Sequence, residues 1–179
     1  NKVARRVKEK ILIPTLKGIR QEKMDFRGIL FVGLMITKEG PKVLEYNVRL
    51  GDPETQVVLP RMKTDLCMVF NQMLNRNLVK LHLEWHEEAA VCVVLASEGY
   101  PEAYETGMEI SGLAQVPDDI MVFHAGTRME GDRLLTAGGR VLNVTAMGKT
   151  VDEARAKAYA GVDLIHFKGK TFRRDIGLT

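Results

Sequence analysis

Apolar positions in the first half of the chain switch from helical to strand spacing. Apolar residues recur about every four positions among Lys and Arg over residues 2–20, which predicts an amphipathic helix that Pro14 kinks or divides. Residues 28–36 are nearly continuously apolar, a pattern typical of a strand buried on both faces. Turn-forming residues at 37–41 precede an alternating run at 44–50, so the two strands are expected to form a hairpin.

Two short helices are expected after the hairpin. Residues 53–58 predict the first helix, and Pro60 interrupts it. Thr64 is expected to cap the second helix, which runs to about Leu74 with its apolar residues inward. The stretch 78–84 then marks a boundary, after which strand patterns dominate.

The second half reads as a small unit rich in strands. Three apolar or alternating runs predict strands at residues 89–96, 120–124 and 140–146. Gly138 and Gly139 are expected to form the hairpin turn before the last of these strands. A capping box at 150–153 starts a helix over 151–164. A short strand at 165–167 and a tail at 172–177 that packs back onto this unit complete the prediction.

Composition and charge exclude several classes of protein. The 179 residues suffice for one ordinary domain or two small ones, and 45% hydrophobic with 27% charged residues is typical of a globular protein. The net charge of +3 is mild and no basic stripe is interleaved with aromatics, which argues against a nucleic-acid partner. No apolar run reaches the roughly 18 residues of a membrane span. Cys67 and Cys92 lie in apolar runs, so buried free thiols are expected, which fits a reducing cytoplasm.

The strand predicted at 44–50 carries a polar row. Glu45, Asn47 and Arg49 alternate with apolar residues, so they are expected to point to one side, roughly 7 Å apart per pair. Carboxylate and amide oxygens suit Mg²⁺, and a guanidinium suits phosphate or carboxylate. The same spacing also fits an ordinary solvated strand face.

The residues after this strand favour a tight turn and a helix start. Gly51 permits close approach of the backbone, and Asp52, Pro53 and Glu54 are residue types favoured at an N-cap and in the first helical turn. The positive end of a helix is a common place for small anions. Capping alone also accounts for Asp52.

The string RLGDPETQ at residues 49–56 resembles the signature of the phosphoribosylamine–glycine ligase family, also called glycinamide ribonucleotide synthetases. The resemblance continues in order along the chain, at residues 28–35, 59–66, 123–127, 138–142 and 174–177. It implies an α+β fold: the C-terminal portion of an ATP-grasp domain at 1–80, followed by a small β-rich C-terminal domain at 81–179.

The resemblance also implies a reaction. ATP phosphorylates glycine to a glycyl phosphate, and 5-phosphoribosylamine then attacks to give glycinamide ribonucleotide in purine biosynthesis. The family's metal positions, for Mg²⁺ or Mn²⁺, fall on Glu45 and Asn47. Arg49 is expected to stabilise the transferring phosphoryl group, and Asp52 and Glu54 to bind the substrate amino groups.

The sequence leaves alternatives open for the apolar residues of the first strand and for His124. Leu34 or Met35 packs against adenine if the first strand contributes to the nucleotide site, and packs in the core otherwise. His124 ends a strand in a small-residue loop, where it either meets a ligand or bonds the backbone.

Family members are far longer than this chain, so the missing N-terminal half, with the lysines that hold ATP, is an expected partner. The piece alone should not catalyse the reaction. The alternative is a non-catalytic binding or interaction module derived from an ATP-grasp ligase. A module that has lost catalysis would have little reason to keep Glu45, Asn47 and Arg49 beside the Gly-Asp-Pro-Glu turn. Another ATP-grasp ligase of purine synthesis is disfavoured by the string RLGDPETQ.

Overall fold

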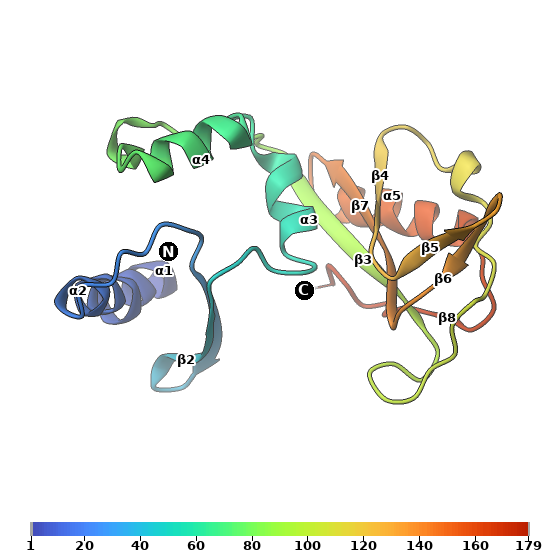
Figure 1. Cartoon of the computed structure of the whole chain (residues 1–179), viewed down its shortest axis with the longest axis horizontal. Helices are drawn as coiled ribbons and strands as arrows, with labels where there is room; N and C mark the ends of the chain where they lie inside the picture. Colours follow the sequence, from blue (N-terminus) through green and yellow to red (C-terminus); the bar gives the residue numbers. More distant parts are fainter. Residues whose placement is uncertain (1, 179) are drawn as a thin grey trace. The chain divides into compact units, whose positions relative to one another are not determined.

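A computed structural model describes residues 2–178 of the chain (Figure 1). The chain divides into two compact units that are interleaved in sequence. Unit 1 contains residues 2–51 and 65–82, and unit 2 contains residues 52–64 and 83–178. Helices are combined with small antiparallel sheets, which confirms the α+β class.

The first helix of unit 1 changes geometry before its proline. It runs as α1 (Lys2–Val7), a π-helical segment η1 (Lys8–Leu12) and α2 (Ile13–Gln21). Pro14 lies in the first turn of α2, where its missing N–H and its ring are accommodated by the wider π turn that precedes it. Instead of a break at Pro14 itself, the structure shows a change of helix type over Lys8–Leu12, directly before the turn that contains the proline.

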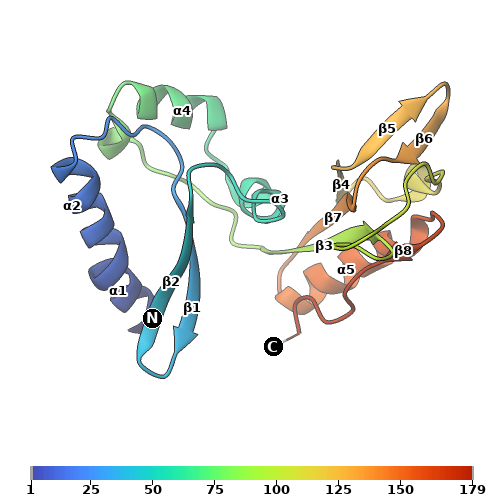
Figure 2. The same cartoon turned by 60° about the horizontal axis from the view of Figure 1, so that its bottom comes forward.

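The predicted hairpin is present as β1 (Phe31–Thr37) and β2 (Gly40–Asn47), which pair antiparallel around a turn at 38–39 (Figure 2). Gly33 pairs with Glu45 and Leu34 with Val43, so Leu44 is the extra residue of a β-bulge. The expectation that β1 is buried on both faces is wrong, because this sheet has two strands and Met35 is 51% exposed.

Unit 1 is completed by α4 (Leu66–Leu74) and the short 3-10 turn η3 (Leu78–Lys80). The predicted cap of α4 is off by one residue. Asp65 caps the helix, since its Oδ1 accepts from the Met68 N–H at 2.8 Å, while the Thr64 hydroxyl accepts from the Glu84 N–H at 2.7 Å.

Unit 2 begins with α3 (Thr55–Val58) and the 3-10 turn η2 (Leu59–Arg61), both of which pack against β3. Its main sheet has the order β4-β7-β3-β8 and is antiparallel throughout. The strands are β3 (Ala89–Ser97), β4 (Ile120–His124), β7 (Arg140–Gly148) and β8 (Lys170–Thr171). The strands predicted at 89–96, 120–124 and 140–146 are thus confirmed.

Two local predictions for unit 2 are wrong. Gly138 and Gly139 do not close a hairpin, because β6 (Arg133–Thr136) pairs with β5 (Thr127–Glu130) in a separate sheet while β7 pairs with β3 and β4. The stretch 165–167 forms only a single bridge, between His166 and Ser111, and the last strand is instead β8. A 3-10 turn, η4 (Leu113–Gln115), lies in the connection between β3 and β4.

The core of unit 2 lies between the sheet and α5 (Val151–Leu164) (Figure 1). Leu142, Val144 and Ala146 on β7 are fully buried and belong to one cluster with Ala154 and other residues of α5. The predicted cap of α5 is confirmed, since the Thr150 hydroxyl accepts from the Glu153 N–H at 3.1 Å. The Glu153 carboxylate reaches back one residue further than a standard capping box, to the Lys149 N–H at 2.9 Å.

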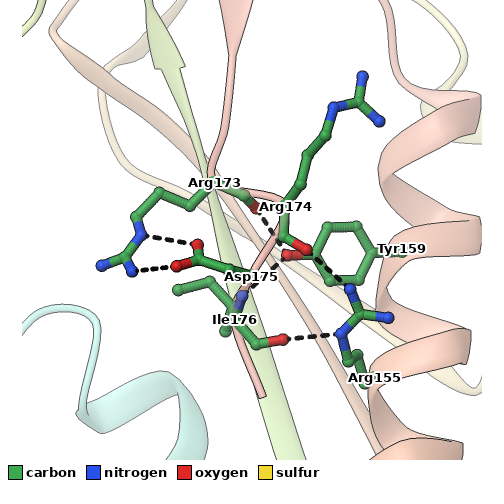
Figure 3. A network of polar contacts seen from close by, with 6 residues as sticks. All are labelled: Arg155, Tyr159, Arg173, Arg174, Asp175 and Ile176. Atoms are coloured by element: carbon green, nitrogen blue, oxygen red, sulfur yellow. Dashed lines mark hydrogen bonds and ion pairs between the residues drawn. The ribbon is translucent and has the colours of Figure 1, made fainter. Parts of the chain in front are cut away.

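The tail packs back onto α5 as expected (Figure 3). Arg155 donates to the carbonyl oxygens of Arg174 (2.7 Å) and Ile176 (3.0 Å). The Tyr159 hydroxyl donates to the Arg173 carbonyl at 2.6 Å and accepts from the Ile176 N–H at 3.2 Å. Two side chains of α5 therefore hold the backbone of the tail.

The two thiols differ in environment. Cys92 is buried as expected, but Cys67 is exposed, because it lies on α4, a helix without buried residues. Within residues 2–178, no helix is long and apolar enough to cross a bilayer.

Candidate functional site

The polar row on β2 is shorter than the sequence predicts. Glu45 and Asn47 lie on the same side of the strand, and the Asn47 side-chain amide donates to Glu45 Oε1 at 2.9 Å. The strand ends at Asn47, so Arg49 lies in the bend beyond it, where its Nη1 donates to the Leu50 carbonyl at 3.0 Å. The placement of Arg49 in one row with Glu45 and Asn47 is therefore wrong.

The donor atoms at this edge fit a hard cation in part. A carboxylate and a side-chain amide supply two oxygens of the kind that Mg²⁺ prefers. The amide now presents its N–H₂ group to Glu45, so it must turn over for its oxygen to face the same ion. In the described part of the chain no group of three His, Cys, Asp or Glu could hold a metal, which leaves the rest of any coordination shell to water and phosphate oxygens.

The register of the hairpin separates Leu34 from Met35. Residues paired across two strands share a face, so Gly33, which pairs with Glu45, and Met35, two residues on, lie on the Glu45 side. Leu34 lies on the opposite side together with Tyr46, whose hydroxyl bonds the Thr15 hydroxyl of α2 at 2.8 Å. Leu34 thus faces the helices of unit 1, and Met35 shares the face of the carboxylate.

Unit 2 contains a second polar cluster around Asp52. Its Oδ1 accepts from Gln56 Nε2 at 2.8 Å, its Oδ2 lies 3.4 Å from Arg140 Nη2, and its carbonyl oxygen accepts from Arg140 Nη1 at 3.0 Å. Asp52 is not the N-cap of α3, which begins at Thr55 with Glu54 in the cap position and no side-chain cap bond. The capping prediction for Asp52 is wrong, because side chains occupy both of its carboxylate oxygens.

A β-bulge brings Arg140 to Asp52. Leu142 pairs with Leu95 and Arg140 with Ala96, so Val141 is an extra residue on β7. The bulge places Arg140 on the sheet face that does not pack against α5. Arg140 follows two glycines in the sequence, and neither this nor its 88-residue separation from Asp52 signals the contact.

Glu54 and His124 lie apart from these bonded groups. The Glu54 side chain is exposed, and its carbonyl oxygen accepts from the N–H groups of Val57 and Val58 at 3.1 and 2.9 Å. His124, at the end of β4, pairs through Nδ1 with the Thr127 hydroxyl at 3.1 Å. The expected bond from His124 to backbone is therefore replaced by a bond to a side chain.

Comparison with known proteins first defines the class. Residues 1–55 match the model of the phosphoribosylglycinamide synthetase ATP-grasp (A) domain, the class of fold that the resemblance of the string RLGDPETQ implied. Residues 90–179 match the model of the phosphoribosylglycinamide synthetase C domain. The chain belongs to the phosphoribosylglycinamide synthetase family.

Individual relatives agree with this family. The chain is 51% identical to a phosphoribosylamine–glycine ligase of Clostridium acetobutylicum, over 98% of this chain and 42% of the relative. It is 47% identical to the trifunctional purine biosynthetic protein adenosine-3 of Gallus gallus, over 96% of this chain and 17% of that protein. The crystal structure of phosphoribosylamine–glycine ligase from Thermotoga maritima matches with a TM-score of 0.81 and 40% identity, over 93% of this chain and 41% of that one.

The chain spans about two fifths of the length of the bacterial ligases that it matches.

Proposed function

We propose that this chain is part of an ATP-dependent ligase that joins glycine to 5-phosphoribosylamine. The observation that carries the proposal is the Glu45–Asn47 edge, with its 2.9 Å contact, directly before the string RLGDPETQ in a member of this family. ATP transfers its terminal phosphoryl group to the glycine carboxylate, giving ADP and glycyl phosphate. The amine then forms the C–N bond as the bond to phosphate breaks, and the amine loses a proton.

Each proposed role follows from the chemistry of the side chain. Glu45 and Asn47 would hold Mg²⁺ or Mn²⁺, which when bound neutralises charge on the ATP phosphates. Arg49 makes one bond through Nη1, so its remaining N–H groups are available for the acyl phosphate. Met35 is an exposed apolar side chain on the face of Glu45, where it can pack against adenine.

Asp52 and Glu54 are assigned to the substrate amino groups. Each oxygen of the Asp52 carboxylate accepts one contact and keeps a second lone pair for an incoming ammonium group. The proposed partners are glycine, 5-phosphoribosylamine, ATP and the missing N-terminal half of the enzyme. The buried free thiol of Cys92 is consistent with a cytoplasmic enzyme.

A chimaera tests the proposal. The matched region of the Clostridium acetobutylicum relative is replaced by this chain, and ADP release is followed with glycine and phosphoribosylamine present or omitted. We expect release that needs both substrates and falls at least 100-fold with Glu45→Ala, the order of effect seen when a preorganised charge-stabilising group is removed. Glu39→Ala, on the turn of the same hairpin, is the control and should retain activity. Substrate-independent release, or an active Glu45→Ala variant, would count against the proposal and favour a non-catalytic module.

A further inference from the structure

Buried polar atoms without partners gather in unit 2. Asn143 and Thr145 on β7 are 0% exposed. Within residues 2–178 the Asn143 amide has no hydrogen-bond partner, and the Thr145 hydroxyl has no nitrogen or oxygen partner beside the neighbouring Cys92 thiol. The Gln56 Oε1 atom is also buried and unbonded. Nearly all buried polar atoms in folded proteins have a partner, so four such atoms in one unit require an explanation.

These atoms belong to one layer, between α3 and the main sheet. Asn143 and Thr145 alternate with the residues of β7 that pack on α5, so they lie on the opposite face. Segment α3 packs against β3 and β7. Arg140 reaches Asp52 from this same face. The layer is therefore bounded by the sheet on one side and by residues 52–58 on the other.

Cys92 lies on the same face of the sheet as Thr145. Cys92 pairs with Thr145 across β3 and β7, and its side chain points to the same side. Burial raises the pKa of the Cys92 thiol, a hydrogen bond with the Thr145 side chain offsets part of that rise, and the Asp52 carboxylate adds to it. The Cys92 thiol therefore belongs to the same layer as Thr145.

Gln56 connects this layer to Asp52. Its Nε2 donates to Asp52 Oδ1 at 2.8 Å, while its Oε1 is buried and has no donor among the described residues. A side-chain amide held at both ends has a fixed orientation, whereas one held at a single end can rotate away. Whatever bonds Oε1 therefore fixes the group that holds Asp52.

Water is the ligand that suits these atoms. They are already closed off from solvent by this chain, so a further protein segment has no access, whereas single waters commonly bond two to four buried polar groups. Such a water can donate to Gln56 Oε1 and exchange bonds with the Asn143 amide and the Thr145 hydroxyl.

We propose that an internal water site beneath α3, formed by Asn143, Thr145 and Gln56 Oε1, fixes Gln56 and through it orients the Asp52 carboxylate. Gln56 is then a positioning residue for Asp52, as Arg140 is from the other side. The kinetic part of this inference rests on the proposed role of Asp52 in binding a substrate amino group. The water site itself does not.

Crystallography tests the water site directly. In a crystal structure of this chain at high resolution, we expect an ordered water within about 3.2 Å of Gln56 Oε1 and of a polar atom of Asn143 or Thr145. Density showing these side chains bonded only to protein groups, with no water between them, overturns the proposal.

The sign of a stability change gives a second test without activity. Thr145→Val removes the hydroxyl and keeps the shape of the side chain. If the hydroxyl bonds an internal water, the variant should lower Tm by about 2–4 °C. If the hydroxyl is truly unbonded, the variant should raise Tm, which contradicts the proposal. Thr106→Val, at an exposed site in the connection between β3 and β4, controls for the substitution itself.

Kinetics of the chimaera test the link to Asp52. Gln56→Met keeps the length of the side chain and removes both polar ends. We expect about a tenfold rise in KM for glycine or phosphoribosylamine, with KM for ATP changed less than twofold. Gln72→Met on α4, the same chemical change in unit 1, should leave all three values unchanged. Equal loss for every substrate, or none, refutes the positioning role.

The two proposals fail in different ways. An unaltered chimaera that shows no substrate-dependent ADP release contradicts the proposed ligase function. The crystallographic test of the water site and the Tm of Thr145→Val remain valid in that case. An active chimaera with normal kinetics for Gln56→Met keeps the function and removes the inference.

Discussion

Gly33 lies directly across the hairpin from Glu45, and the Glu45 side chain crosses over it. A Cβ atom at position 33 would lie 3.0 Å from Glu45 Cγ and 3.7 Å from Oε1. The side chain of Glu45 therefore owes its position beside Asn47 partly to the absence of a side chain at residue 33.

Gly33→Ala should displace Glu45 and weaken its proposed role as a metal ligand. In the chimaera we expect a 10- to 100-fold loss in apparent Mn²⁺ affinity, the range seen when groups that orient a ligand are altered. The measurement is the Mn²⁺ concentration at half-maximal activity. Gly18→Ala is the matched control, because an added Cβ there meets nothing within 4 Å. An unchanged Mn²⁺ requirement in Gly33→Ala would show that the glycine does not position Glu45.

Gly18 and Gly161 are both helical glycines, and alanine should act on them with opposite sign. In α5, a Cβ at Gly161 would lie 2.9 Å from Ile120 Cγ2 and 3.0 Å from Val144 Cγ1. Gly161→Ala should cost about 1–3 kcal/mol through overpacking. Gly18→Ala in open space should instead stabilise α2 by about 0.5–1 kcal/mol. Urea unfolding of both variants decides the matter, and two changes of the same sign would contradict the packing described.

The cap of α5 should contribute measurably to stability. Thr150→Ala removes the acceptor for the Glu153 N–H and should cost about 1 kcal/mol in the free energy of unfolding. Thr150→Ser retains the oxygen and should restore most of that loss. Equal destabilisation by Ala and Ser would mean that the methyl group, and not the cap, is responsible.

The tail contains a carboxylate with an altered titration. A bidentate pair with Arg173, at 2.9 and 2.6 Å, holds the pKa of Asp175 below its ordinary value (Figure 3). Because the folded pKa is the lower one, the small stability that this pair contributes is present above the ordinary carboxylate pKa. It is lost as the pH falls through the lowered value.

Carboxyl NMR titration measures this effect. We expect Arg173→Ala to move the Asp175 midpoint up toward about 3.9, the ordinary aspartate value. Arg174→Ala is the control, since the Arg174 guanidinium lies over the Phe172 ring, 5.1 Å from its centroid, and points away from Asp175 (Figure 3). A shift of similar size in both variants would mean that general charge, and not the bidentate pair, sets the titration.

Local patterns in the sequence predicted much of the fold. Alternation located the hairpin and β7, and the Thr150 cap located the start of α5. These features depend on neighbouring residues, so a single sequence contains them. The two bulges, at Leu44 and Val141, leave no local signature, and each shifts which side chains share a face. The end of β2 before Arg49 was missed for the same reason, because alternation continues past the point where pairing stops.

The environment of Asp52 shows what local reasoning cannot supply. The residue types at 52–54 favour a helix cap, and that interpretation failed because Gln56 and Arg140 compete for the carboxylate. Gln56 lies four residues on, a spacing that could have suggested the contact. Arg140 comes from a distant strand after a bulge, and only the folded chain reveals it.

The interleaving of the two units has a chemical consequence. The chain crosses between them at 51–52, 64–65 and 82–83. Residues 52–64, which pack against β3 and β7 of unit 2, therefore precede residues 65–82 of unit 1 in the sequence. A protease that cleaves at 82–83 and releases residues 83–179 would separate the sheet from residues 52–64. Cys92, which is buried in the intact chain, should then react with thiol reagents and so report the loss of residues 52–64.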